Sequence, residues 1–177
     1  MNTAGKHFVT VIQGEFQVSR DPDVILSTIL GSCVAVCLFD PEAHIGGMNH
    51  YLLPGTEGAD SGNKRYGVNA MELLINELQK NGASRERLQA KLFGGAVINQ
   101  GSRDIGGANV AFGKEFLEHE GIICLSESTG GTQARRLHFA PHSGAARMMI
   151  VPADEAPAPV PTAAAKPAVA AGEIDLF

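Results

Sequence analysis

The stretch STILGSCVAVCLFDPEAHIGGMNHYLLP, residues 27–54, decides the fold and carries both a cysteine and a histidine. Residues 33–39 are apolar or small at every position, which is typical of a strand buried on both faces. The polar run 40–44 contains Asp40 and Pro41, two residue types that favour tight turns. Residues 45–53 then provide the return strand, so the sequence predicts a β-hairpin.

The register of this hairpin decides which side chains meet. If Leu38 pairs with Ile45, Cys33 lies directly opposite His50. Residues directly opposite in an antiparallel pair have Cβ atoms about 4.5–5.5 Å apart. A slip of one residue would put the two side chains on different faces. In the first register, the hairpin predicts a pair formed by a thiol and an imidazole.

Such a pair has a definite chemical use. A free thiol has a pKa of about 8.5 and is only a few per cent ionised at pH 7. An imidazole beside it can remove the proton and later protonate a leaving group. The backbone N–H groups around Gly31 and Ser32, just before the cysteine, can stabilise an oxyanion. A hydroxyl from Ser27 or Thr28 can orient the imidazole, and the spacing leaves that choice open.

Two other interpretations compete with catalysis. Buried cysteines are commonly small core residues, so packing alone accounts for the pair. Cys33, Cys37, His44 and His50 together imitate a zinc site. On a strand, however, the two cysteines lie about 13 Å apart, too far to share one ion or form a disulfide. The sequence therefore predicts neither a metal nor a cofactor.

Five blocks of sequence resemble, in order, the signature of the chemoreceptor glutamine deamidases, the CheD family. The blocks are LGSCVAVCLFD (30–40), GGMNHYLLP (46–54), AKLFGGA (90–96), IGGANV (105–110) and GGTQAR (130–135). The resemblance covers about residues 8–151. It implies a nucleophile at Cys33 and a base at His50. The third catalytic position, a Thr six residues before the Cys in some members, falls on Ser27, with Thr28 next to it.

The resemblance also implies a substrate, partners and a fold. The substrate would be glutamines on the helical cytoplasmic region of methyl-accepting chemoreceptors, with a CheC-type phosphatase as a further partner in organisms that have one. The fold would be a layered α/β sandwich like that of the cysteine deamidase toxins. The alternative is a non-catalytic module on the same scaffold that binds chemoreceptors or adaptors.

The remaining elements agree with this fold class, an α/β sandwich with a mostly antiparallel sheet and helices packed on sheet faces. Residues 55–67 are polar and rich in glycine, typical of a connector. Asn109 is placed to cap the second helix, and Cys124 to be buried in a strand. The predicted strands are two within 8–18, then 24–26, 89–93, 122–125, 137–140 and 145–151, and the predicted helices are 68–81 and 110–120.

A second candidate site lies in the glycine-rich segment 130–136. The hydroxyl of Thr132 and the guanidinium of Arg135 can together bind a carboxylate or a backbone carbonyl of a substrate. A structural ion pair is an equally simple role for the arginine.

Composition sets the wider limits. The chain has 177 residues, a net charge of −5 and three cysteines. The charge disfavours nucleic acid as a partner. Because the sequence shows neither a signal peptide nor a span of about 20 apolar residues, we expect a cytoplasmic protein without membrane insertion. We expect a deamidase domain at 1–152 and a disordered Pro/Ala-rich tail at 153–177. The tail ends in EIDLF, either a docking peptide or a frayed end.

Overall fold

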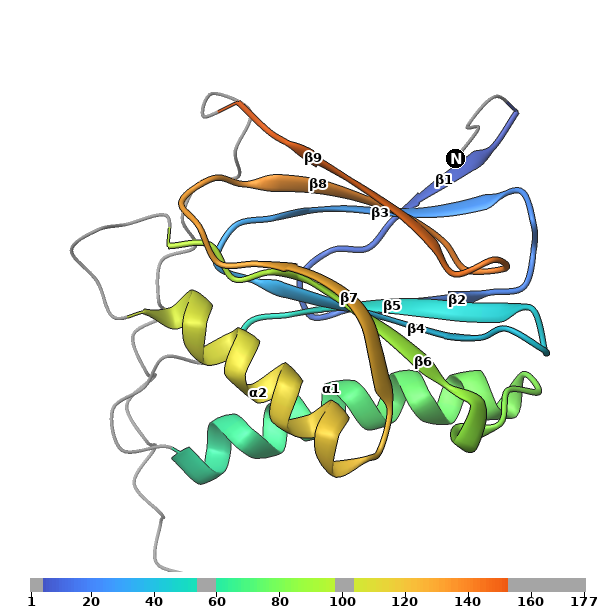
Figure 1. The fold of residues 1–177 in the computed structure, drawn as a ribbon, viewed down its shortest axis with the longest axis horizontal. Helices are drawn as coiled ribbons and strands as arrows, with labels where there is room; N and C mark the ends of the chain where they lie inside the picture. The colour runs from blue at the N-terminus through green and yellow to red at the C-terminus, as the bar shows by residue number, and fades with distance from the viewer. Residues whose placement is uncertain (1–4, 54–59, 98–103, 153–177) are drawn as a thin grey trace, which may run out of the picture.

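The structure is a computed structural model that describes residues 5–53, 60–97 and 104–152. These residues form three layers: a four-stranded sheet, a five-stranded sheet beneath it, and two helices beneath that (Figure 1). The predicted tail and its EIDLF end lie outside the described residues. No helix in the described ranges is both long enough and apolar enough to cross a membrane.

The two sheets are mostly antiparallel, as predicted. In the four-stranded sheet only β1 and β3 run parallel, and in the five-stranded sheet only β6 and β7 do. The first sheet has the order β1 (His7–Thr10), β3 (Val24–Leu30), β8 (Arg135–Ala140), β9 (Ala145–Ile150). The second has the order β2 (Phe16–Ser19), β5 (Ile45–Tyr51), β4 (Val34–Asp40), β6 (Gln89–Gly94), β7 (Ile123–Thr129).

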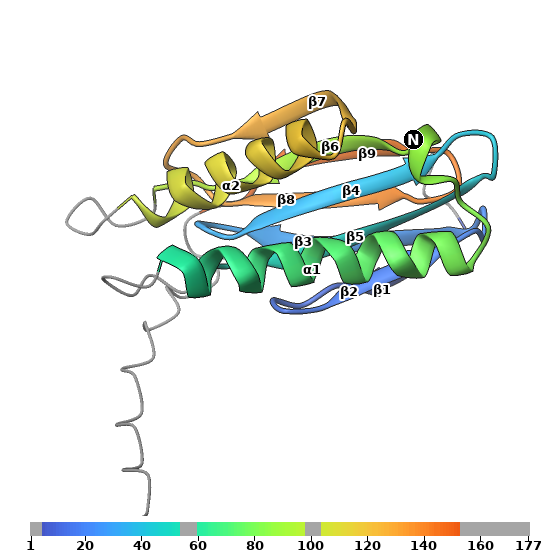
Figure 2. The same ribbon diagram turned by 90° about the horizontal axis from the view of Figure 1, so that it is seen from below.

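Both helices, α1 (Asp60–Lys80) and α2 (Ile105–His119), pack on one face of the five-stranded sheet (Figure 2). A short 3-10 helix (Arg85–Arg87) precedes β6. The layered α/β class predicted from the sequence is confirmed. Helices cover only one face of that sheet because the four-stranded sheet covers the other.

Strand β4 shows why the sequence is apolar at every position there. Val34, Val36 and Leu38 join the core that the helices complete. Ala35 and Cys37 point the other way, into the core between the two sheets. Each of these five residues is fully buried. The strand therefore lies at the centre of the molecule, as its composition predicts.

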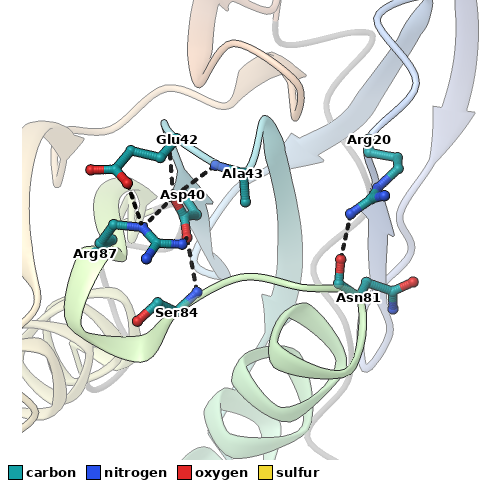
Figure 3. Close-up of polar contacts among 7 residues, drawn as sticks. All are labelled: Arg20, Asp40, Glu42, Ala43, Asn81, Ser84 and Arg87. Carbon is teal, nitrogen blue, oxygen red and sulfur yellow. Dashed lines mark hydrogen bonds and ion pairs between the residues drawn. The ribbon is translucent and has the colours of Figure 1, made fainter.

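The predicted register of the β4–β5 hairpin is wrong by two residues. Asp40, not Leu38, pairs with Ile45. The strand extends as far as Asp40 because the carboxylate of that residue accepts the backbone N–H groups of Glu42 and Ala43 at 3.0 and 3.1 Å, which closes a tight turn (Figure 3). A shift of two residues leaves every side chain on its predicted face.

Other boundaries also differ from the prediction. Helix α1 begins at Asp60, so residues 60–67 are helix and not connector. The cap of α2 is Asp104, whose carboxylate accepts the N–H of Gly107 at 2.7 Å, and not Asn109. Cys124 is exposed because β7 is an edge strand, whereas the sequence predicted it buried. Strand β3 continues beyond residue 26 to Leu30.

Candidate active site

A histidine and a threonine from different sheets meet in the core between them. The Oγ1 of Thr28, on β3, lies 2.9 Å from Nδ1 of His50, on β5. The carbonyl of Val11 lies 3.3 Å from the same nitrogen. Because a carbonyl only accepts hydrogen bonds, the bond to Val11 requires a hydrogen on Nδ1. The lone pair is then on Nε2, which makes that nitrogen the basic one.

The structure decides between the two hydroxyls that the sequence left open. Neighbouring residues on a strand point to opposite faces, and Thr28 faces inward while Ser27 faces outward. Ser27 pairs with His138 in the sheet, and its carbonyl accepts the N–H of Val11 at 2.9 Å. The hydroxyl of Thr28 is therefore the one that contacts the imidazole.

The cysteine lies on the connection from β3 to β4, which joins the two sheets (Figure 1). With the observed register, Ala35 lies opposite His50, and Cys33 is two residues further along the same face. Cys33 is therefore a diagonal neighbour of His50 and not, as predicted, its direct partner. Diagonal neighbours are about 7–8 Å apart, within reach of longer side chains.

Burial disfavours the charged form of both the thiol and the imidazole. Burial raises the pKa of the Cys33 thiol to about 11. Burial also lowers the pKa of His50, against a smaller opposing effect of the Val11 carbonyl. Among the described residues, Nε2 of His50 has no hydrogen-bond partner, and the thiol donates to Oε1 of Gln13 at 3.3 Å. A neutral thiol and a neutral imidazole thus lie on one face with the basic nitrogen uncommitted.

Three successive carbonyls hold the segment before and at the cysteine. The carbonyls of Gly31 and Cys33 accept the N–H groups of Ala96 and Gly95, each at 2.8 Å. The carbonyl of Ser32 accepts Nδ2 of Asn109 at 3.1 Å. In a trans peptide the C=O and the following N–H point in opposite directions. The N–H groups of residues 32–34 therefore point away from these partners.

Two glycines allow this close approach. Gly94 and Gly95 have φ values of 110° and 69°, which L side chains rarely adopt. A Cβ on Gly94 would strike the carbonyl of Cys33, and one on Gly95 would strike Val110. The block AKLFGGA thus supplies a close backbone contact for the cysteine loop.

Asn109 is the positioning residue that the sequence reasoning missed. Its side chain is fully buried in α2 and joins both halves of the site. Nδ2 donates to the carbonyl of Ser32, and Oδ1 accepts the N–H of Leu53 at 2.7 Å. Its backbone carbonyl accepts the hydroxyl of Tyr51 at 2.8 Å. Asp104 already caps α2, so Asn109 is not needed as a cap. A polar asparagine inside an apolar helix is the sequence signal for such a positioning role.

The second predicted site is not assembled as a substrate site. Arg135 is buried, and its guanidinium donates to the carbonyls of Gly94, Ser128 and Gly130. The predicted fork that binds carbonyls is present, but it binds the backbone of this chain. Thr132 is exposed on the loop before it. Since its donors are directed at internal carbonyls, Arg135 stabilises the end of β6 against the β7–β8 loop.

The metal alternative finds no support in the described part of the chain, which contains no group of three or more Cys, His, Asp or Glu side chains placed to hold an ion. Cys33 and Cys37 are free thiols. His44, at the hairpin turn, stacks on His142 with ring centroids 4.9 Å apart, away from the cysteine.

The layered α/β fold places a thiol, an imidazole and a hydroxyl, those of Cys33, His50 and Thr28, in the layer between its two sheets. Residues 52–149 match the family model CheD, described as chemotactic sensory transduction. Two relatives, both named "Probable chemoreceptor glutamine deamidase CheD", come from Caulobacter vibrioides and Rhizobium meliloti. The first is 52% identical over 96% of this chain and 92% of its own length. The second is 54% identical over 88% and 87%. The chain belongs to the CheD family.

Among solved structures, a Neisseria meningitidis protein of the family model DUF152 is similar over 72% of this chain and 65% of its own. Its sequence identity is 12% and the TM-score is 0.48.

Proposed function

We propose that this protein is a chemoreceptor glutamine deamidase in which Cys33 is the nucleophile, His50 the base and Thr28 the residue that orients the base. The contact of 2.9 Å between Thr28 and Nδ1 of His50 carries the proposal. It fixes the ring so that the basic Nε2, unpartnered among the described residues, is available on the face that holds Cys33. The names of the CheD relatives support the substrate.

The first half of the reaction forms a thioester. Nε2 of His50 takes the thiol proton while the sulfur of Cys33 attacks the side-chain carbonyl carbon of a glutamine. The carbonyl π electrons move to the oxygen, and the N–H groups of Ser32 and Cys33 are the candidate donors for this oxyanion. The imidazolium then protonates the amide nitrogen, the C–N bond breaks, and ammonia leaves.

The second half releases the product. A water molecule gives a proton to Nε2 and attacks the thioester carbon. When the tetrahedral intermediate collapses, the C–S bond breaks and the sulfur regains the proton from the imidazolium. The receptor residue leaves as glutamate. The loss of an amide and the gain of a carboxylate make a site that is negatively charged and open to methylation.

The protonated thiol determines when the proton is transferred in the reaction. A thiol with a pKa near 11 is protonated at neutral pH, so proton transfer has to accompany the attack. Substrate that covers the site excludes water and strengthens the interaction between the thiolate and the imidazolium. Substrate binding therefore favours the ion pair that the attack requires.

The substrate and partners follow from the same proposal. A receptor glutamine is held on a large helical protein, which suits a site at the end of a sandwich where a segment of another chain can approach. A CheC-type phosphatase would be a regulator of the same enzyme, and the cytoplasm the compartment in which receptor signalling domains are found.

The test is direct conversion of receptor glutamines. We expect purified protein to convert specific glutamines of a chemoreceptor cytoplasmic fragment to glutamates, detected by peptide mass spectrometry. Cys33→Ala should abolish conversion, and His50→Ala should slow it by about 10²–10⁴-fold. Retained circular dichroism spectra control for folding. Equal conversion by wild type and Cys33→Ala would end the enzymatic proposal and leave the non-catalytic binding module.

A further inference from the structure

One contact of the nucleophile is unexplained by the mechanism. Gln13 lies on the loop between β1 and β2, and its side chain is exposed. Its Oε1 nevertheless accepts a hydrogen bond from the thiol of Cys33 at 3.3 Å. The group that contacts the nucleophile is thus a carboxamide, the same functional group that the proposed substrate brings.

The loop that carries Gln13 is fixed to the site. The N–H of Glu15 donates to the carbonyl of Ile12 at 3.1 Å, and Gly14 has a φ of 89°, as in the third position of a type II turn. The N–H of Gly14 donates to the carbonyl of His50 at 2.7 Å, and the N–H of His50 donates to the carbonyl of Glu15 at 3.0 Å. Since the backbone is bound on both sides, movement of Gln13 is confined to its side chain.

The same contact occupies the hydrogen of the Cys33 thiol. The thiol hydrogen is directed to Gln13, while Nε2 of His50 has no partner among the described residues. A reacting carboxamide has to come within about 3–3.5 Å of the sulfur. That space is held by the carboxamide of Gln13, which therefore competes with an incoming one.

We propose that Gln13 is a built-in substrate mimic that holds the Cys33 thiol in the resting protein and swings out into solvent when a receptor glutamine enters. The inference rests on the proposed function, since only a carboxamide substrate makes Gln13 a mimic. The thiol donates its hydrogen to the oxygen of Gln13, so the sulfur stays protonated in this contact and is not a nucleophile towards the Gln13 carbonyl carbon. Gln13 is therefore held without being consumed, and its departure lets the thiol turn to Nε2 of His50.

The test compares Gln13→Ala with wild type and with Gln17→Ala, which removes an exposed glutamine from the neighbouring strand β2. For the receptor fragment we expect Gln13→Ala to lower KM by about three- to tenfold, the factor expected of one neutral hydrogen bond, with kcat unchanged. Alkylation of Cys33 by iodoacetamide, followed by peptide mass spectrometry, should be faster by a similar factor. Gln17→Ala should match wild type in both measurements.

Several results would overturn the mimic. A lower kcat with unchanged KM would make Gln13 an oxyanion donor, and unchanged KM and alkylation would make the contact incidental. Conversion of Gln13 to glutamate in wild type, absent in Cys33→Ala, would show that it is consumed. The alkylation measurement separates the two proposals. If wild type converts no receptor glutamine but Gln13→Ala still speeds alkylation, the proposed function fails, while the hold of Gln13 on the thiol stands.

Discussion

The two ends of the β4–β5 hairpin differ in how many hydrogen-bond partners their buried polar groups have. At the turn, the buried carboxylate of Asp40 has all its capacity used: it accepts the N–H groups of Glu42, Ala43 and Ser84 and a two-pronged contact from Arg87 (Figure 3). At the open end, the thiol of Cys33 has one weak contact, and Nε2 of His50 has none among the described residues.

The pKa values express the same difference. Burial alone would raise the pKa of Asp40, but the hydrogen bonds from Arg87 and from three backbone N–H groups lower it to about 2. At the other end, burial is opposed only by a smaller effect of a backbone hydrogen bond and raises the pKa of Cys33 to about 11. The turn is thus built for stability, and it fixes the register that places the less stable, reactive end.

The largest effect should separate the two adjacent hydroxyls at the open end. Because only the Thr28 hydroxyl contacts His50, we expect Thr28→Ala to lower kcat by about 10²-fold through misplacement of the ring. Ser27→Ala, on the outer face, should stay within about twofold of wild type. Steady-state deamidation of a receptor fragment measures both. Equal and mild losses would remove the hydroxyl from the mechanism.

The next effect concerns the link between the cysteine loop and the histidine strand. Asn109→Ala leaves the half-buried carbonyl of Ser32 and N–H of Leu53 without their side-chain partner, so we expect a loss of about 3 kcal/mol in the free energy of unfolding. Activity should fall as well, because both halves of the site shift. Urea unfolding with Asn81→Ala as control, an exposed asparagine at the end of α1, makes the comparison. A stable but inactive variant would give Asn109 a role beyond positioning.

At the turn of the hairpin, we expect a substitution of Asp40 to lower the stability of the protein without changing its activity. The folded pKa of Asp40 lies below the ordinary value of 3.8, so its stabilisation is complete above that value and is lost as the pH falls towards 2. Asp40→Asn should remove about 2 kcal/mol at neutral pH and flatten that acid decline. Chemical unfolding at several pH values tests this, with the exposed Asp21→Asn as control. An unchanged acid decline in Asp40→Asn would contradict the assignment.

The smallest expected effect is on the pH dependence of kcat/KM. Protonated His50 cannot accept the thiol proton, and burial lowers its pKa below the ordinary 6.5. The acid limb of kcat/KM should therefore lie below pH 6.5, so that at pH 6.5 the rate keeps more than the half expected of an unshifted imidazole. An acid limb at or above pH 6.5 would mean that the surroundings of the His50 imidazole are more polar than its burial indicates.

The sequence predicted more of the local structure than of the contacts. The apolar run of β4 and the turn at Asp40 identify their elements because each depends on neighbours in the chain. The predicted register was wrong by two residues because the sequence does not show that Asp40, the last residue of the strand, closes the turn with its carboxylate. The sequence predicts a cap at Asn109 and not a link between segments, because the partners of its side chain, Ser32 and Leu53, are far away in the chain.

By itself the sequence determined the layered α/β class and the central buried hairpin, and it predicted a shared face for Cys33 and His50 in one register of that hairpin. These depend on alternation with a period of two, which a register shift of two leaves unchanged. Only the tertiary structure decided that Thr28 and not Ser27 meets the imidazole, that Arg135 binds internal carbonyls, and that Gln13 reaches the thiol. Each of those contacts joins segments from different sheets or loops, and a hydrogen bond depends on distances in space that no spacing along the chain encodes.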